Sequence, residues 1–448
     1  MKNHPYVVFL AALLGLVCVT PLRAETLEAA VSEAVGSHPA VSAARAAYDA
    51  SEETVREQRS AYYPDLSVNA TAGRLYGDNA TSRGLSVTRG AGYSWLWEGN
   101  ASLTQKIFDW GETGNRVDAA LARETAANAG VLGRQDEIAL RAVQSYITLM
   151  RATDLKARAE TNLANIRGYQ EKIEVQVQEG GADEAELNRA NDFLLLAQNA
   201  ATEFEGQYQQ GLAEYIEAVG HPPVDVLKRP AALPSLPESI DSAVSTAIAV
   251  HPQIAAAKQS VLATDHDRRV ESTSYLPKVS GQLSYLKRDQ DDIIGGEAID
   301  ARAVVKADWA YSTGGAQLAR EDRAAYLNEQ AKSELDDAMR RTERDIRVAW
   351  ATLDTSRRQQ ATQADRSVAT AKVVETYKTQ YDGGSRTLIE LMQAESQAFD
   401  ASVAYANADY GVMAATYTLL AAMGELVPSL HSGTTMDSVA DAEPANRP

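Results

Sequence analysis

The chain contains two copies of one pattern, and this internal duplication constrains its fold more than any other feature. In each copy a His-Pro pair is followed by a Tyr-x-Pro segment, and the spacing from His38 to Pro64 is the same as that from His251 to Pro277. Other corresponding segments are Phe108–Gly111 with Tyr311–Gly314, Glu186–Ala190 with Glu390–Ala394, and Ala218–Gly220 with Ala422–Gly424. Self-similarity of this kind indicates a repeated structural unit.

The duplication divides the chain into a first repeat over residues 25–220 and a second over 238–424. They are separated by a Pro-rich connector over 221–237, and a polar tail follows over 425–448. Residues 1–24 have a basic start, an apolar centre and a small residue at Ala24, which is typical of a secretory signal peptide. Its removal would take away two basic residues and Cys18, the single cysteine, so the net charge would change from −18 to −20. A lipid anchor on Cys18 is weakly supported, because the bulky Val17 precedes it.

Each repeat has the same predicted order of elements: a helix, a β-hairpin, a very long helix and a shorter helix. The hairpins follow from strict alternation, as in Leu66 and Val68 against Asp65 and Ser67. The long helices are Ala-rich with few breakers, and ~67 residues at ~1.5 Å each would make rods of about 100 Å. The predicted bounds are helix 26–61, strands 65–76 and 93–109 and helices 112–179 and 184–219, then helix 238–274, strands 278–288 and 299–311 and helices 315–381 and 387–423.

The strands are apolar on one face only, and four of them cannot close a barrel within one chain. An open sheet in lipid would leave unpaired backbone groups at both edges, and a closed membrane barrel needs at least ~8 strands. Several chains must therefore contribute to one barrel if this is a membrane protein of α+β class. A soluble β-sandwich is the alternative, and the long rods argue against it. Aromatic residues beside the strands are expected at the bilayer interfaces, namely Trp95, Trp97, Trp110, Trp309 and Tyr311.

Composition and motifs exclude several other functions. A net charge of −18 argues against binding to nucleic acid. The six histidines are scattered without metal-ligand spacing, and no nucleotide-binding or hydrolase motif is present. We therefore expect no catalytic residues, no metal and no cofactor. The His-Pro pairs fit helix boundaries better than ligand sites.

The chain resembles the TolC-like outer-membrane factor family over essentially its whole length after the leader. The resemblance rests on the two helix–hairpin–long helix–helix halves, the His-Pro and Tyr-x-Pro landmarks, Phe108–Gly111 and above all the stretch Tyr381–Leu391. It implies a homotrimer in the outer membrane of a Gram-negative cell, with a twelve-stranded barrel continued by a helical tunnel through the periplasm. It also implies a periplasmic adaptor and an inner-membrane pump, either an ABC exporter or a proton-driven pump, as partners, and contact with outer-membrane lipid.

The resemblance also assigns roles at the periplasmic end of the tunnel. Tyr381 and Arg386 would hold the entrance closed, and Glu390 would belong to an acidic constriction. Glu186, on the equivalent turn of the first half, would be the acidic partner that Tyr381 or Arg386 holds. Gln393 stands where some members carry a second acid, so one carboxylate ring is expected in place of two.

The expected function is the exit duct of a tripartite export system without enzymatic activity. The tip sequence resembles secretion-associated members and favours type I protein secretion, with multidrug efflux as the alternative. A competing interpretation of a different class is a non-conducting scaffold that spans the periplasm. These three possibilities differ in conductance and in the pump that co-purifies.

Overall fold

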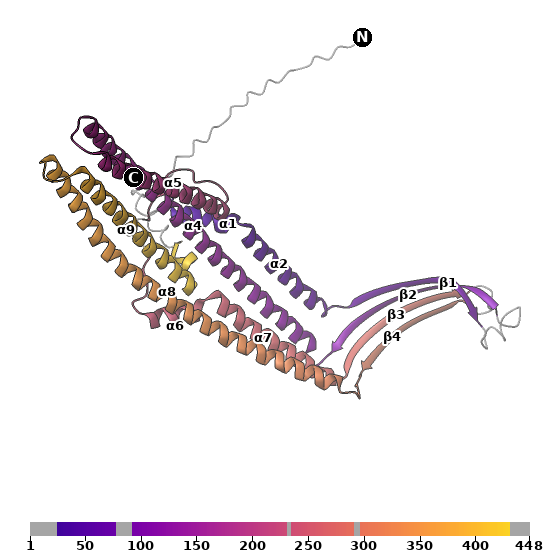
Figure 1. Ribbon diagram of the computed structural model, residues 1–448. Helices are drawn as coiled ribbons and strands as arrows, with labels where there is room; N and C mark the ends of the chain where they lie inside the picture. The colour runs from indigo at the N-terminus through magenta and orange to yellow at the C-terminus, as the bar shows by residue number, and fades with distance from the viewer. Residues whose placement is uncertain (1–24, 78–91, 231–233, 291–295, 431–448) are drawn as a thin grey trace, which may run out of the picture.

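The protein is a long bundle of helices with a curved sheet at one end, as the computed structural model shows (Figure 1). The structure describes residues 25–77, 92–230, 234–290 and 296–430. The predicted signal peptide over 1–24, with Cys18, and residues 431–448 of the predicted tail lie outside these ranges. No helix in the described ranges is both long enough and apolar enough to cross a bilayer.

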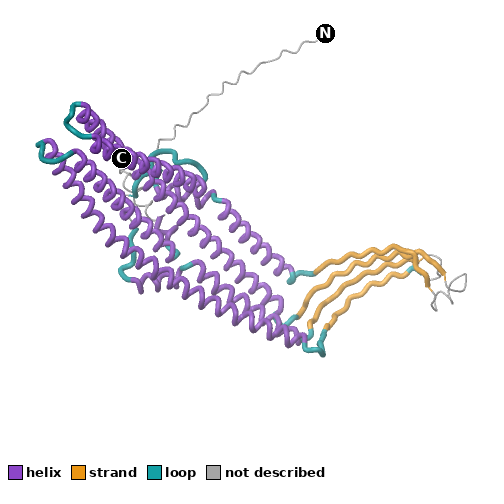
Figure 2. Tube along the Cα trace, viewed as in Figure 1, coloured by secondary structure: helices purple, strands orange, loops and turns teal. Residues whose placement is uncertain are grey.

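The two halves contain the same α-helices and strands in the same order, and the second half has in addition one short 3-10 turn (Figures 1 and 2). The first half has α1 (Leu27–Ser37), α2 (Pro39–Ser60), β1 (Asp65–Gly77), β2 (Gly92–Phe108), α4 (Glu112–Gln178) and α5 (Glu184–Val219). The second has α6 (Ile240–Val250), α7 (Pro252–Ser272), the single 3-10 turn η1 (Thr273–Tyr275), β3 (Lys278–Gln290), β4 (Ala298–Asp308), α8 (Ala316–Asp382) and α9 (Leu388–Met423).

The first helix of each half is broken, whereas one continuous helix was expected over 26–61 and over 238–274. The break lies at His38 and at His251, which both have extended backbone before a proline. A residue before proline is kept out of the helical region, and proline fits the first position of the next helix. The ring Nδ1 of His38 accepts a hydrogen bond from the Ala40 N–H at 3.1 Å, so the histidine caps α2. The fourth strand also ends earlier than expected, at Asp308, so Trp309 and Tyr311 follow it.

The duplication is visible in the backbone at the glycines with positive φ. These form three pairs, 111 with 315, 180 with 384 and 220 with 424, and the offset along the chain is the same in each pair. α4 and α8 both have 67 residues, and α5 and α9 both have 36. The sequence alignment of Phe108–Gly111 with Tyr311–Gly314 was wrong by one position, because Gly111 corresponds to Gly315 at the start of the long helix.

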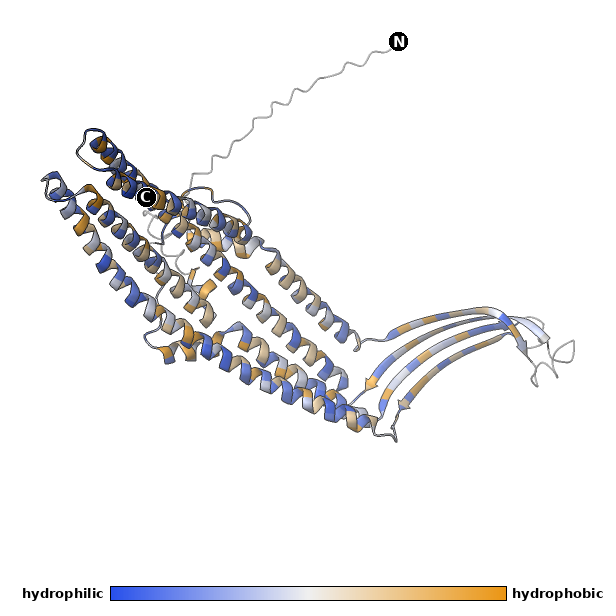
Figure 3. Ribbon diagram, viewed as in Figure 1, coloured by the Kyte–Doolittle hydropathy of each residue, from blue (hydrophilic) through white to orange (hydrophobic). Residues whose placement is uncertain are grey.

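The four strands form one antiparallel sheet in the order β1-β2-β3-β4. Apolar residues lie opposite one another across all four strands, and polar residues alternate with them in the next row (Figure 3). One apolar row is Leu66, Leu103, Leu283 and Ala303, and the neighbouring polar row is Ser67, Ser102, Ser284 and Arg302. Within the described chain, β1 and β4 each pair on one side only, so the sheet has two open edges.

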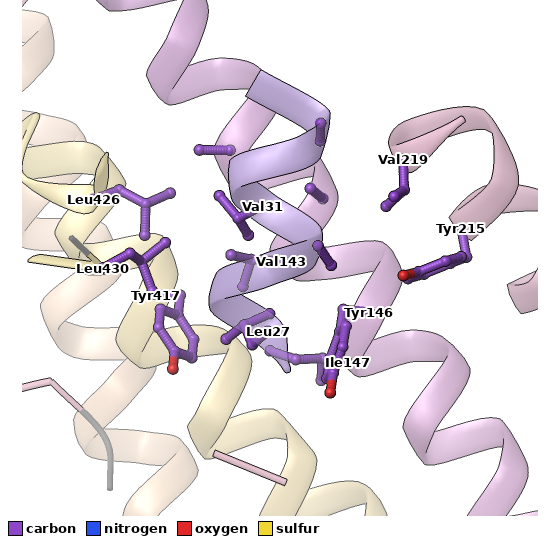
Figure 4. Close-up of a cluster of buried hydrophobic side chains, with 14 of the residues drawn as sticks. Leu27, Val31, Val143, Tyr146, Ile147, Tyr215, Val219, Tyr417, Leu426 and Leu430 are labelled. Atoms are coloured by element: carbon purple, nitrogen blue, oxygen red, sulfur yellow. The ribbon is translucent and has the colours of Figure 1, made fainter. Parts of the chain in front are cut away.

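The main hydrophobic core lies midway along the helices, where α1 packs against α4, α5 and α9 (Figure 4). Tyr146 donates to the backbone oxygens of Glu25 at 2.9 Å and Lys228 at 2.7 Å. Tyr215 donates to the Glu25 carboxylate, which also accepts from the Val224 N–H at 2.9 Å. The start of the connector is therefore fastened to Glu25, which precedes α1, and to α4.

Further along the connector, Arg229 is held by an ion pair. Arg229 contacts both oxygens of the Asp409 carboxylate on α9, one of them at 2.9 Å. Gln360 of α8 donates to the same carboxylate at 2.7 Å. Asp409 is buried, and the hydrogen bonds from Arg229 and then Gln360 hold its pKa below the usual range. The connector thus joins α4 of the first half to α8 and α9 of the second.

The buried Asp409 carboxylate makes Arg229 the side chain of the connector on which stability depends most. We expect Arg229→Ala to lower the free energy of unfolding by about 2 kcal/mol, because it leaves this carboxylate with one hydrogen-bond donor. Arg358→Ala is the matched control, since Arg358 pairs with Asp354 on an exposed helix surface, and it should change stability by less than about 0.5 kcal/mol. Equal effects in denaturant titrations followed by circular dichroism would contradict this assignment.

The same pair should make stability depend on pH in the acid range. The pKa of Asp409 is lower in the folded than in the unfolded chain, so the unfolded chain binds more protons there. This stabilisation is present above the unfolded pKa of about 3.9 and is lost as the pH falls through the lower folded value. Unfolding midpoints measured from pH 6 downward should therefore converge for the parent chain and Arg229→Ala, and a constant difference would argue against the pair.

Candidate functional site: the tip of the helical bundle

Two short turns close the helical bundle at the end opposite the sheet (Figure 1). One joins α4 to α5 and the other joins α8 to α9. Both have the hydrogen bonds of a Schellman motif: Gly181 N–H donates to Gln176 O at 2.7 Å, and Ser385 N–H donates to Gln380 O at 2.8 Å. Gly180 and Gly384 supply the positive φ that this turn requires, at 79° and 74°.

The helices that follow the two turns begin in the same way. Asp183 caps α5 and accepts from the Glu186 N–H at 2.7 Å, and Thr387 caps α9 and accepts from the Glu390 N–H at 3.3 Å. Glu186 and Glu390 are therefore both the third residue of their helices. In α9 the Glu390 carboxylate also accepts from the Thr387 N–H at 3.0 Å, which completes a capping box.

Arg386 lies against three side chains of the helices that its turn joins, two from α8 and one from α9. Its Nη1 is 2.7 Å from Oε1 of Glu390, and its Nε donates to Gln380 at 3.2 Å. The guanidinium stands over the ring of Tyr377, 4.3 Å from the centroid. The Thr387 N–H and then Arg386 lower the pKa of Glu390, so this carboxylate is ionised at neutral pH.

Tyr381 connects the two halves near the tip. Its hydroxyl accepts a hydrogen bond from Gln176 of α4 at 3.3 Å. The ring is half-buried against a cluster in which Ile173 of α4 packs with Leu391 and Met392 of α9. Tyr381 therefore holds α8 against α4 of the same chain.

The structure does not bring Glu186 to Tyr381 or Arg386 within one chain. In the described residues the Glu186 carboxylate has no ion-pair partner, and Arg386 pairs with Glu390. Gln393 is exposed one helical turn beyond Glu390. The predicted pairing of Glu186 with Arg386 would thus need a second copy of the chain.

A further contact near the tip was missed in the sequence. Tyr169 of α4 donates to the Glu395 carboxylate of α9 at 3.0 Å. Burial and the neighbouring Glu395 raise the pKa of Tyr169 to about 12, so its hydroxyl remains a donor. No local signal marks this pair, because it depends on how α4 packs against α9, 226 residues apart.

The predicted interface aromatics fall into two groups along the sheet. Trp110 donates to the Pro277 oxygen at 2.8 Å and Trp309 to the Tyr275 oxygen at 3.1 Å, and Tyr311 stacks on Trp309. These three lie where strands meet helices, whereas the exposed Trp95 and Trp97 lie in β2 towards the far end of the sheet. Trp97 and Phe108 are ~11 residues apart in β2, which corresponds to about 36 Å along the strand. If the strand is tilted by ~40° from the bilayer normal, this length crosses roughly 28 Å of the bilayer.

No metal site accompanies these features: the described residues contain no group of three or more His, Cys, Asp or Glu arranged to hold an ion.

The family model for outer membrane efflux proteins matches residues 30–221 and 243–425, which is most of both halves. The chain belongs to the outer membrane efflux protein family. This confirms the resemblance on which the sequence interpretation was based.

Relatives and solved structures agree with this membership. The chain is 26% identical over 408 residues to the outer membrane efflux protein BepC of Brucella suis biovar 1 (strain 1330), which covers 90% of this chain and 86% of BepC. A membrane protein from Pseudomonas aeruginosa has a TM-score of 0.77 at 18% identity, covering 89% of this chain and 91% of its own. The CmeC outer membrane channel of Campylobacter jejuni has a TM-score of 0.75 at 17% identity, covering 92% and 89%. The structural likenesses show the fold.

Family membership confirms three expectations from the sequence. The efflux protein is located in the outer membrane of a Gram-negative cell and extends into the periplasm. Its class is that of channels and not of enzymes. The α+β fold, mostly helical with a small sheet, is that of TolC-like channels.

The Tyr169–Glu395 contact predicts a local weakening when it is removed. Tyr169→Phe leaves the Glu395 carboxylate without this donor and should loosen the first turns of α9 by about 1–2 kcal/mol. Hydrogen exchange of the α9 amides should become faster there and unchanged in the core around Tyr146. Tyr405→Phe is the control, since the Tyr405 hydroxyl makes no hydrogen bond within the described chain, and equal exchange in both variants would contradict the contact.

Proposed function

We propose that this efflux protein is the outer-membrane exit duct of a tripartite export system and acts as a homotrimer. The observation that carries this proposal is the sheet, which is apolar on one face and open at both edges. In lipid those edges must pair, and three copies would join β4 of one to β1 of the next in a closed barrel of twelve strands. The helices would then continue the barrel as a tunnel through the periplasm.

The tip is the periplasmic entrance in this proposal. Tyr381 and Arg386 hold the entrance closed, Glu390 forms the acidic constriction, and Gln393 leaves that constriction with one carboxylate ring. Glu186 of a neighbouring copy is the acid that Arg386 meets across the subunit boundary. The half-exposed pair of Arg386 with Glu390 supports this role, because such a pair can exchange its partner at little cost.

The duct works with two partners, a periplasmic adaptor and an inner-membrane pump that selects the cargo. The tip sequence Tyr381–Leu391 favours an ABC exporter and type I protein secretion. The relative BepC is named an outer membrane efflux protein, which favours the efflux alternative instead. Co-purification of the cross-linked complex from native membranes distinguishes them: an ABC exporter supports secretion, and a proton-driven pump supports efflux.

The entrance role of Arg386 predicts a change in conductance. Arg386→Ser should raise the single-channel conductance in planar bilayers, because it removes the cation that meets Glu186 of the neighbouring copy in the closed entrance. Arg358→Ser, on the exposed surface of α8, is the matched control and should conduct like the parent. An unchanged small conductance of Arg386→Ser would remove Arg386 from the entrance mechanism.

The same recordings test the duct itself against the scaffold interpretation. A scaffold predicts no conductance in any variant and extraction from membranes without detergent. A conducting trimer that requires detergent for extraction supports the duct.

A further inference from the structure

A hollow of about 400 Å³ lies at the end of the helical layer that adjoins the sheet. Its walls are α2, α4, α7 and α8, which pack side by side in this order (Figure 1). The lining residues come from the last turns of α2 and α7 and the first turns of α4 and α8. Three of them are arginines, Arg116, Arg123 and Arg323, in a chain whose net charge is −18. The hollow is therefore a local exception to the acidic character of the chain.

The hollow lies on the same side of the molecule as the polar face of the sheet. Lys278 belongs to the polar set of β3 with Ser280 and Gln282, and its ammonium contacts the Glu112 carboxylate. The other oxygen of Glu112 is 2.7 Å from Arg116, which lines the hollow. Successive ion pairs thus lead from the polar face of the sheet into the hollow. In the proposed barrel the apolar face contacts lipid, so this side is the inner side of the duct.

The charges of the hollow do not cancel. Arg123 of α4 pairs with Asp267 of α7. Arg323 of α8 is exposed, and in the described part of the chain its guanidinium has no ion-pair partner. The carboxylate of Glu271 on α7 also lines the hollow without such a partner there. With the lysine and glutamate of the sheet junction included, four cations stand against three carboxylates among these described residues, so one positive charge is in excess.

The duplication shows which wall of the hollow lacks carboxylates. Thr54 of α2 corresponds to Asp267 of α7, and Gln58 corresponds to Glu271, at the offset that relates the two His-Pro pairs. All four residues line the hollow. The α2 wall thus has a hydroxyl and an amide at the positions where α7 has two acids. Both groups can donate a hydrogen bond to an anion, whereas a carboxylate would repel it.

We propose that this hollow binds oxyanions, namely carboxylate or phosphate groups of the material that passes through the duct. Arg323 is the main binding residue, because its guanidinium is free of an acid and its planar fork fits two oxygens of such a group. Thr54 and Gln58 donate hydrogen bonds to the same group. Glu271 opposes binding and keeps it weak enough for release, as passage through a channel requires. This inference rests on the proposed duct and adds to it a chemical class of material.

The test is isothermal titration calorimetry on the full chain in detergent, at neutral pH and low salt, because salt screens exposed charges. Sodium citrate is the carboxylate probe and sodium pyrophosphate is the phosphate probe. Binding of either probe supports the site and shows which group it accepts. Binding of neither probe overturns the site.

Three variants make the result specific. Arg323→Gln should weaken binding by about tenfold or more, because it removes a charge-assisted pair with the anion. Glu271→Gln should strengthen binding, because it removes a repelling charge at nearly constant shape. Arg358→Gln is the matched control, since Arg358 pairs with Asp354 on an exposed surface of the same helix, and it should bind like the parent. Equal affinities of Arg323→Gln and Arg358→Gln would overturn the assignment.

Single-channel recordings of the parent chain separate this inference from the proposed function. Calorimetry does not depend on conduction, so a chain that binds a probe but never conducts overturns the duct and leaves the oxyanion site in place. A chain that conducts but binds neither probe overturns the oxyanion site and leaves the duct in place.

Discussion

The unpaired backbone groups at the two edges of the sheet are the constraint on which the rest of this structure depends. Hydrocarbon offers no hydrogen bonds to replace water, so an edge strand in lipid must pair with another strand. The described chain has four strands and leaves β1 and β4 open. In the proposed trimer, neighbouring copies would complete the sheet, which accounts for both its apolar face and its open edges.

The two halves share the same order of helices and strands and the same backbone turns, whereas their side chains differ. In the described residues, six glycines with positive φ recur at a constant offset, so turns and helix ends are repeated. At the tip the side chains of the two turns differ, and one difference is that Arg386 precedes the cap of α9 whereas Ala182 has the same place before α5. In the proposed trimer, the cation of one turn would meet Glu186 of the other turn in a neighbouring copy.

Local patterns predicted the hairpins and long helices, because alternation and unbroken Ala-rich stretches depend on near neighbours. The His38 break was missed in the helix bounds although the His-Pro pair itself indicates a boundary. At the tip, the capping box of Thr387 and Glu390 can be read from sequence, whereas the partner of Arg386 cannot. Tyr169 and Glu395 meet only because α4 packs on α9, and no spacing along the chain encodes that contact.

Two ion pairs of the described chain, Arg229 with Asp409 and Arg386 with Glu390, differ in a way that would suit the proposed entrance at the tip. Arg229 holds a buried carboxylate together with Gln360, so moving it would strand a charge away from water. Arg386 and Glu390 are both partly exposed, and water can replace either partner. The middle of the bundle, where the connector ties the halves together, is thus the fixed part. In the proposed duct, the tip, where the contacts are partly exposed, would be the part that moves.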